Sequence, residues 1–285
     1  MLTRIQSAGL RAIREAASFP LWVLADDQRG RALEKLNGSM VSEVGFPEGS
    51  LRFMTPTPLL QARASSILSK EPDTIQWIDC FKPSDVFWDV GANVGMFSLY
   101  AARRRGVQVR AFEPSADNYM VLCRNVEMSS LDDRIIPYCI ALTGNTGLGV
   151  LNSPSREMGA AVHQFGRRGE TSRYCNGSTN VCAQGMIGFT IDDIIQQFRP
   201  SFPTRLKLDV DGLEWSILQG ARETLRDPRL QSIMVELSIS DEVERDRAIA
   251  WLSDSGFELV SQGEIQEAGG EKAANHFFAR VLASI

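Results

Sequence analysis

The sequence predicts an α/β fold that is doubly wound around a mostly parallel sheet. From residue 85 onward, short apolar runs suited to buried strands alternate with stretches of helical spacing, and the joints between them are short. This alternation is typical of parallel strands whose connecting helices cover both faces of a sheet. The first unit is the clearest: an apolar strand over residues 86–90, a turn with Gly91 and Gly95, and a helix over residues 96–105. Such a strand–turn–helix opening is typical of nucleotide-binding sheets.

The remaining elements continue this rhythm. A polar, glycine-rich connection separates the last two expected strands, which predicts an antiparallel hairpin at the end of the chain. The expected strands are residues 107–112, 135–142, 206–210, 232–237, 257–261 and 276–282, and the expected helices are residues 116–128, 214–226 and 241–255, with a further helix starting near residue 190.

We divide the chain into an N-terminal cap, residues 1–73, and a main domain, residues 74–285. The cap is expected to be mainly helical, with helices over residues 2–13, 26–36 and 61–68, and with loop or extended chain over residues 46–57, where prolines and a glycine gather. Within the main domain, residues from about 143 to 187 are rich in Gly, Ser, Asn and Arg and predict a long irregular insert. The cap could cover the cofactor, line the substrate cleft or mediate homodimer formation, or it could only shield one face of the sheet.

Bulk composition excludes several classes of protein. The chain has 285 residues, of which 44% are hydrophobic and 23% charged, as in an ordinary globular protein. A net charge of -5 argues against a nucleic acid as the main partner. The five cysteines are an odd number without a C-x-x-C pair, so neither a zinc site nor a disulfide framework is indicated. No apolar run approaches the roughly 20 residues of a membrane span, and no export signal is convincing; we therefore expect a cytoplasmic location.

The turn after the first strand favours one cofactor. Only Gly91 and Gly95 are present, so the tight turn is kept but the third glycine of a pyrophosphate cradle is missing. Asp89 at the strand tip would repel a pyrophosphate, whereas it suits a cationic group such as the amino end of a methionine moiety. No Lys-Ser or Lys-Thr pair follows, which excludes a P-loop. The turn therefore favours S-adenosylmethionine.

An acid at the next strand tip agrees with a nucleoside ligand. Glu113 lies 24 residues after Asp89, which places it at the end of the second strand, where an acid binds ribose hydroxyls. Nicotinamide enzymes use an acid at the same place, so Glu113 does not discriminate between the two cofactors.

Acids also gather at the later strand tips. Asp209, Asp211 and Glu214 follow one strand and Glu236 ends the next. Ligands of open α/β sheets bind at this edge, so these acids could hold a methionine amino group, accept a hydroxyl proton or ligate a divalent metal. The metal candidates are Asp209, Asp211 and Glu236. Lys207 alternates with Asp209 and Asp211 along the strand, so it could pair with one of them or orient a substrate oxygen.

Two histidines are present. His163 lies in the insert and could reach a cleft, and His276 begins the last expected strand. A lone histidine is more often structural than catalytic. His163 is kept as a third candidate base beside Asp209 and Glu236.

The ordered set of motifs resembles the FkbM family of S-adenosylmethionine-dependent methyltransferases. The resemblance extends over roughly residues 85 to 240. It rests on residues 89–98, 111–114 with 124–125, 190–193, 207–214 and 235–237. It implies a Rossmann-like class I methyltransferase fold, with seven mostly parallel strands and an antiparallel last strand, and methyl transfer that is usually to oxygen.

Carried over by position, the resemblance implies roles for single residues. Asp89, Gly91, Asn93 and Gly95 would form the cofactor loop, Glu113 would contact the ribose, and Asp209 would be the acid beside the methyl donor. Two positions depart from the family pattern: Asp211 stands where Glu is common, and Leu213 where Ala is common. The shorter acid reaches less far, which weakens a metal or base role for Asp211.

The leading prediction is S-adenosylmethionine-dependent O-methylation of a hydroxyl on a sugar, glycolipid or natural product, by direct displacement. Asp209, Glu236 or His163 would remove the hydroxyl proton. One alternative is a nicotinamide-dependent oxidoreductase, against which Asp89 and the missing glycine speak. Another is a methyltransferase-like subunit without catalytic activity.

Overall fold

The computed structural model describes residues 25–28, 30–31, 40–169, 182–268 and 271–281. The chain forms two compact units, Met1–Val41 and Ser42–Ile285. The predicted first helix, from Leu2 to Ile13, lies outside the described residues. The second predicted helix is seen only in part, at residues 26–28 and 30–31.

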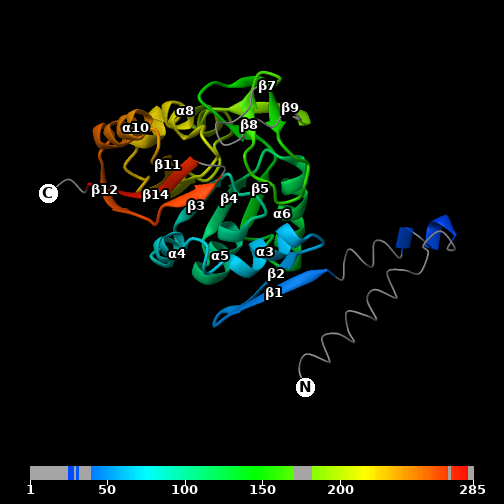
Figure 1. Cartoon of the computed structure of the whole chain (residues 1–285). Helices are drawn as coiled ribbons and strands as arrows, with labels where there is room; N and C mark the ends of the chain where they lie inside the picture. Colours follow the sequence, from blue (N-terminus) through cyan, green and yellow to red (C-terminus); the bar gives the residue numbers. More distant parts are fainter. Residues whose placement is uncertain (1–24, 29, 32–39, 170–181, 269–270, 282–285) are drawn as a thin grey trace. The chain divides into compact units, whose positions relative to one another are not determined.

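The second unit is built on a mostly parallel sheet, as the sequence predicts (Figure 1). Its strand order is β12-β14-β11-β10-β3-β4-β5, and the short β13 pairs with β14. Neighbours from β11 to β5 run parallel, whereas β14 is antiparallel to both β11 and β12. The direction in which successive strands are added to the sheet reverses between β3 and β10. Open α/β sheets bind ligands at such a reversal. The bounds are β3 Val86–Val90, β4 Gln108–Phe112, β5 Ile135–Tyr138, β10 Arg205–Leu208, β11 Ser232–Ser238, β12 Phe257–Gln262, β13 Gln266–Ala268 and β14 Glu271–Arg280.

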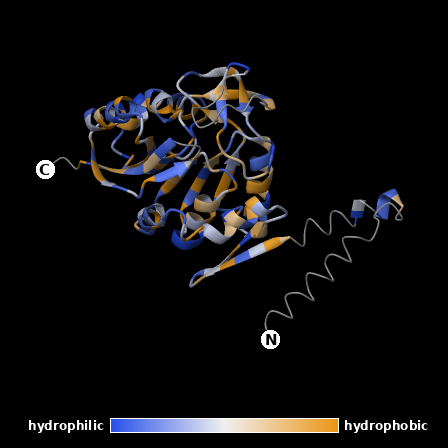
Figure 2. Cartoon of the chain, viewed as in Figure 1, coloured by the Kyte–Doolittle hydropathy of each residue, from blue (hydrophilic) through white to orange (hydrophobic). Residues whose placement is uncertain are grey.

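Helices cover both faces of this sheet because successive strand residues point to opposite sides. Phe87 packs into one hydrophobic core, whereas Trp88 and Val90 pack into the other. The first core takes helices α3 to α6 and the second takes α7 to α10. In Figure 2, helix α10 alternates between hydrophobic and hydrophilic residues, as suits one face against the sheet. The bounds are α3 Pro58–Ser66, α4 Pro72–Asp79, α5 Met96–Arg105, α6 Ala116–Met128, α7 Ile191–Phe198, α8 Glu214–Gln219, α9 Arg222–Arg226 and α10 Glu242–Asp254.

Local signals start several helices where the sequence expects them. The Thr190 hydroxyl accepts a hydrogen bond from the backbone N of Asp193 (3.0 Å) and caps α7. Asp192, in the first turn of α7, accepts the backbone N–H groups of Glu223 and Thr224 at the start of α9. Residues 214–226, predicted as one helix, are therefore two, α8 and α9.

The described part of the insert at 143–187 is partly built of strands and is not irregular throughout, which corrects the prediction. It carries strands β7 Gly147–Ser153, β8 Gln164–Gly166 and β9 Cys182–Phe189, which join β6 Ala141–Leu142 in a second sheet of order β6-β9-β7-β8. A Cβ at Gly149 or Gly188 would lie 2.5 and 2.8 Å from the Phe165 ring. Because these glycines have no side chains, the Phe165 ring can lie across the strands. Glycine is also uncommon in strands, so no strand pattern is visible in the sequence. The predicted strand 135–142 is likewise divided between the two sheets.

The described part of the region before the sheet contains strands as well as helices. Strands β1 Val41–Phe46 and β2 Gly49–Met54 form a two-stranded sheet, and β2 falls in the stretch expected as loop or extended chain. Asn125 of α6 accepts from the backbone N of Met54 (2.7 Å) and donates to the carbonyl of Val94 (2.8 Å). It therefore ties β2 to the turn that follows β3. Residues 42–73 lie in the same compact unit as the sheet, and their role as a cap stays a prediction.

Gly95 should matter more for folding than Gly106, although both have a left-handed backbone (φ +86 and +67). A Cβ at Gly95 would lie 2.4 Å from Leu122 and 2.7 Å from Leu99, whereas at Gly106 it meets open space. We expect Gly106→Ala to lower the free energy of unfolding by about 1–2 kcal/mol and Gly95→Ala by a further ~1–3 kcal/mol. Urea-induced unfolding of both variants measures this difference, and equal losses would contradict it.

Candidate functional site

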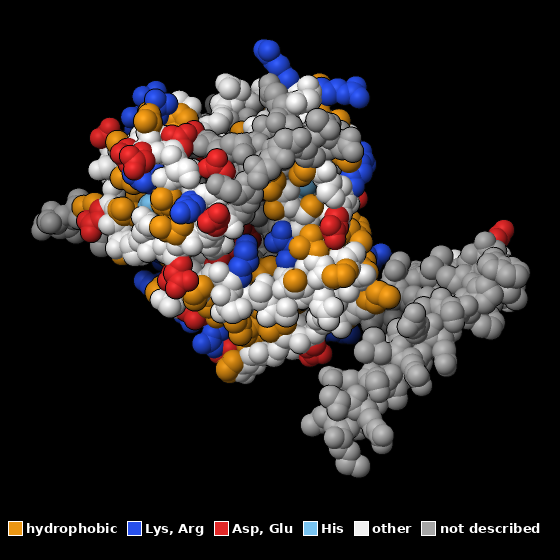
Figure 3. Space-filling model, in the orientation of Figure 1, with side chains coloured by type: hydrophobic (Ala, Val, Ile, Leu, Met, Phe, Trp, Pro, Cys, Tyr) orange, Lys and Arg blue, Asp and Glu red, His pale blue; other side chains and the backbone are white. Residues whose placement is uncertain are grey.

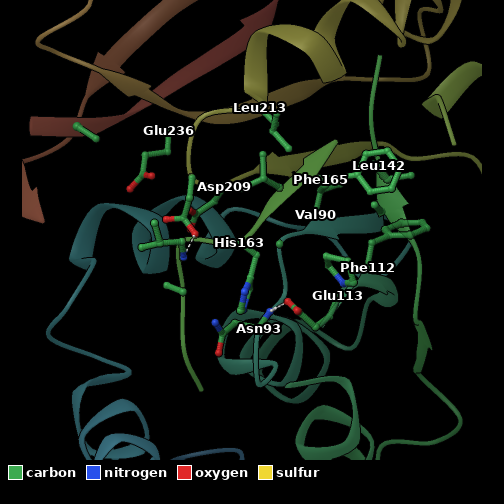
Figure 4. Close-up of a pocket in the computed structure, with 18 of the residues that line it drawn as sticks. Val90, Asn93, Phe112, Glu113, Leu142, His163, Phe165, Asp209, Leu213 and Glu236 are labelled. Atoms are coloured by element: carbon green, nitrogen blue, oxygen red, sulfur yellow. Dashed lines mark hydrogen bonds between the residues drawn. The ribbon is translucent and has the colours of Figure 1, made fainter. Parts of the chain in front are cut away.

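A cavity of about 330 Å³ lies at the carboxyl ends of the central strands (Figure 4). It is large enough for a small-molecule ligand. Gly91 and Asn93 reach it from the turn after β3, and the second sheet closes one side with Phe165. Among the predicted site residues, the cavity is lined by Gly91, Asn93, Glu113, His163, Asp209, Asp211 and Glu236.

The turn after β3 is built by left-handed residues. Gly91, Asn93 and Gly95 all have positive φ angles, of 81°, 50° and 86°. The backbone N–H groups of Gly91 and Ala92 both donate to the carbonyl of Phe112 at 3.0 Å, which fastens the turn to the end of β4. A Cβ at Gly91 would lie 1.7 Å from the carbonyl oxygen of Asp209, so only glycine lets the turn pass the end of β10.

Glu113 lies at the end of β4, as predicted. Its two carboxylate oxygens accept the backbone N–H groups of Asn93 and Ser115, each at 2.8 Å. Burial raises the pKa of Glu113 to about 7. Glu113 thereby connects the turn after β3 with the start of α6, and it presents a buried acid to the cavity.

Asp209 is held ionised by a buried lysine. Lys207 Nζ lies 2.6 Å from Asp209 Oδ2 and 4.0 Å from Asp89 Oδ1, so the expected pairing of Lys207 is confirmed. Burial alone would raise the pKa of Asp209, but the charge of Lys207 outweighs it and the pKa falls below its usual value. Asp209 therefore presents a fixed negative charge to the cavity.

Asp89 lies behind the cavity rather than in its lining. The Ser98 hydroxyl donates to Asp89 Oδ2 at 2.6 Å, and Lys207 faces the other oxygen. Burial raises the pKa of Asp89 above its usual value, against the opposing charge of Lys207. Gly95, which caps α5, is also absent from the lining. Direct contact of either residue with a cofactor stays a prediction.

The two acids after Asp209 hold backbone in place. Asp211 accepts from the backbone N of Val162 at 2.6 Å, and burial raises the pKa of Asp211 to about 6. Glu214 accepts from the backbone N of Val210 (3.0 Å) and of Gly212 (3.0 Å), and burial raises its pKa to about 7. Glu214 therefore shapes the loop after β10.

Glu236 extends into the cavity from β11 (Figure 4). Burial raises the pKa of Glu236 well above its usual value, and the charges of Asp209, Glu214 and Asp211 raise it further. A carboxylate in such surroundings has a high affinity for a proton. Of the three predicted bases, Glu236 is the one whose pKa lies above its usual value.

His163 lies in the cavity wall with both ring nitrogens engaged. Nε2 lies 3.2 Å from the carbonyl of Ala160, and Nδ1 lies 2.8 Å from the hydroxyl of Ser153. Nε2 also lies 3.3 Å from the side-chain amide nitrogen of Asn118. Burial lowers the pKa of His163. These contacts make His163 less suited to proton removal than Glu236. The other histidine, His276, is buried within β14.

Two cationic side chains that were not predicted as site residues also line the cavity. Arg63 comes from α3 and Lys70 from the segment after it. Neither residue belongs to a sequence motif. Both lie far from the sheet strands in the sequence, so nothing in the sequence indicates that they reach the site. The apolar part of the wall likewise joins distant segments, through Phe112, Ile140, Leu142, Leu151, Phe165 and Leu213.

The predicted metal role finds no support in the arrangement of the acids. Within the described ranges, no group of three or more His, Cys, Asp or Glu side chains is placed to hold a metal ion. Asp209 is paired with Lys207 and Asp211 with backbone. A metal role for Asp209, Asp211 and Glu236 therefore stays a prediction.

The described helices include none that is both long and apolar enough to cross a bilayer.

The order and directions of the strands define a Rossmann-like domain with a cavity at the carboxyl ends of its central strands. A family model described as the methyltransferase FkbM domain matches residues 89–259. The chain therefore belongs to the FkbM methyltransferase family, as the resemblance predicts. This membership places it among methyltransferases rather than nicotinamide-dependent oxidoreductases.

Relatives with assigned names share only a modest sequence identity with this chain. The methyltransferase sdnD of Sordaria araneosa is 28% identical over 203 residues, which cover 62% of this chain and 76% of sdnD. The hexuronic acid methyltransferase AglP of Haloferax volcanii is 25% identical over 154 residues, which cover 54% of this chain and 56% of AglP. A crystal structure of methyltransferase FkbM from Methylobacillus flagellatus aligns with a TM-score of 0.46 and 17% identity, over 76% of this chain and 53% of that chain.

The raised pKa of Glu214 has a measurable consequence for stability. A folded-state pKa of about 7 lies above the usual 4.5, so the native state holds this proton more tightly than the unfolded state. The resulting stability is present at low pH and is lost as pH rises from about 4.5 through 7. Relative to the wild type, Glu214→Gln should gain up to about 3 kcal/mol of unfolding free energy between pH 5 and 8.

Urea-induced unfolding at both pH values measures this change, because glutamine keeps one acceptor for the backbone but does not titrate. Parallel pH profiles of the two proteins would contradict the assigned proton.

Proposed function

We propose that this chain is an S-adenosylmethionine-dependent methyltransferase that acts on a hydroxyl oxygen of a sugar, glycolipid or natural product. The main observation in support is that two acids from separate strand tips, Glu113 and Asp209, line one cavity. The turn of Gly91 and Asn93 lies between them. Family membership supports the methyl transfer.

The cavity residues suit this cofactor. Oε2 of Glu113 accepts one hydrogen bond, from the backbone of Asn93, and retains a lone pair for a ribose hydroxyl. The apolar wall of Phe112, Leu142 and Phe165 suits an aromatic base. The charge of Asp209 suits the amino group of a methionine moiety. When bound, the cofactor supplies a methyl group on a positively charged sulfur.

The roles of the acids follow from their proton affinities. Asp209 is ionised and paired, so it is a weak base but a good electrostatic partner for a cation. Glu236 has a raised pKa, so it is suited to accept the hydroxyl proton. With the cofactor bound, Glu236 would accept the proton of the hydroxyl whose oxygen takes the methyl group. Orientation of the two partners supplies much of the rate.

The acceptor class is supported by one relative. The Haloferax volcanii relative is named as a hexuronic acid methyltransferase, and the open part of this cavity combines carboxylates, cations and an apolar wall. Such a surface suits a polar ring with hydroxyl groups.

The cofactor assignment predicts binding of S-adenosylhomocysteine. We expect Glu113→Ala to weaken this binding by about tenfold or more, because it removes charge-assisted hydrogen bonds. Isothermal titration calorimetry measures the change. The matched control is Glu127→Ala, an exposed glutamate on α6, which should leave the affinity unchanged. Absence of binding to the wild type would contradict the proposed function.

The assignment of the base predicts a loss of rate without a loss of binding. We expect Glu236→Gln to lower kcat by roughly 10²–10⁴-fold with little change in the affinity for S-adenosylhomocysteine. The wild-type rate should rise with pH as Glu236 ionises, and the variant should lose this rise. Transfer of labelled methyl groups to a panel of uronic acids and glycosides provides the assay.

The same assay distinguishes a subunit without catalytic activity. Such a protein would bind S-adenosylhomocysteine but transfer no methyl group to any acceptor of the panel.

A further inference from the structure

Arg63 is fixed at the edge of the cavity by one hydrogen bond. Its Nε donates to the carbonyl of Gly159 at 2.6 Å. The next residue, Ala160, accepts from the side chain of Asn93 at 2.9 Å. Arg63 is therefore anchored beside the turn that follows β3, and it lines the cavity there.

The guanidinium group of Arg63 is surrounded by acids but paired with none of them. Asp209, Asp211, Glu113 and Glu71 all act on it electrostatically, and burial lowers its pKa. Among the described residues, however, no carboxylate oxygen comes within 4.0 Å of Arg63, whereas Lys207 and Lys70 each have such a partner.

Each of the four acids already has closer partners. Glu71 accepts from Lys70, Thr74 and Asn275. Asp209 is bound by Lys207, Asp211 by the backbone of Val162, and Glu113 by the backbone of Asn93 and Ser115. The fork of Arg63 is thus left for a ligand. In Figure 3, basic and acidic side chains lie close together around the hollow near the centre of this face.

We propose that Arg63 binds the carboxylate of a ligand in this cavity. A guanidinium fork with Nε anchored to a carbonyl presents its terminal N–H groups to two oxygens at once, which matches carboxylate geometry. This inference rests on the proposed function. Under that function two ligand carboxylates can reach Arg63: the α-carboxylate of the methionine moiety and the carboxylate of a uronic acid acceptor.

The position of Arg63 favours the methionine carboxylate. Arg63 and Asn93 are joined through residues 159 and 160, and Asp209 provides an acid on the same cavity. An amino acid zwitterion presents one positive and one negative group a few bonds apart, so Asp209 and Arg63 together complement both.

The test compares ligands that differ only in the amino acid portion. S-adenosylhomocysteine carries the carboxylate and amino group, whereas 5′-methylthioadenosine lacks both. We expect Arg63→Gln and Arg63→Met to weaken S-adenosylhomocysteine binding by about tenfold or more and to leave 5′-methylthioadenosine binding within about twofold. Glutamine can still donate to the Gly159 carbonyl, so it preserves the local fold. The control is Arg124→Gln, an exposed arginine paired with Glu127, which should change neither affinity.

A second arm tests the acceptor. With S-adenosylhomocysteine saturating, the affinities for D-glucuronate and D-glucose are compared in the wild type and in Arg63→Gln. A selective loss for glucuronate, with unchanged S-adenosylhomocysteine binding, supports the acceptor carboxylate as the partner. The inference is overturned if both adenosine ligands weaken equally, since Arg63 then only shapes the cavity. It is also overturned if neither S-adenosylhomocysteine nor glucuronate depends on Arg63. A wild type that binds neither adenosine ligand instead overturns the proposed function itself.

Discussion

The arrangement of the site depends on the buried ion pair between Lys207 and Asp209. The Lys207 side chain is only 1% exposed, and its ammonium group lies between the acids that end β10 and β3. Loss of one partner of a buried pair typically costs about 3–5 kcal/mol, because the remaining charge has no compensation. Here a single lysine balances Asp209 and stands close to Asp89, so it joins the two central strands where the sheet order turns back. Asp209 keeps its charge because of this lysine.

The negative charge of Asp209 also determines how protons are distributed over its neighbours. Asp211 and Glu236 both lie close enough for Asp209 to raise their pKa values in addition to burial. Carboxylates that share a site cannot all ionise at the same pH. Under the proposed function, Asp209 keeps a fixed charge while Glu236, once ionised, accepts the proton, which divides electrostatic binding from base catalysis within one cavity.

The second sheet and the loop before β8 complete the cavity. Val162 has a φ of 68°, an unfavourable angle for a β-branched residue, and its backbone N–H is held by Asp211. Ala160 in the same loop accepts from Asn93 and Asn118. The loop is thus fastened to the turn after β3, to α6 and to the segment after β10, and the insert forms part of the site rather than a separate appendage.

Local patterns in the sequence were sufficient to predict the sheet, the turn of Gly91 and the positions of the acids Glu113, Asp209 and Glu236. Strand periodicity and the common edge of parallel strands determine where such residues meet. They were insufficient for the second sheet, whose glycines at 149 and 188 are explained by the ring of Phe165, a contact between distant segments. They were also insufficient for Arg63, whose role depends on Gly159 and on the prior engagement of every neighbouring acid. Nor could the sequence predict which acid keeps a fixed charge and which one accepts a proton. Proton affinity depends on burial and on the distance to Lys207, and these quantities exist only once the chain has folded.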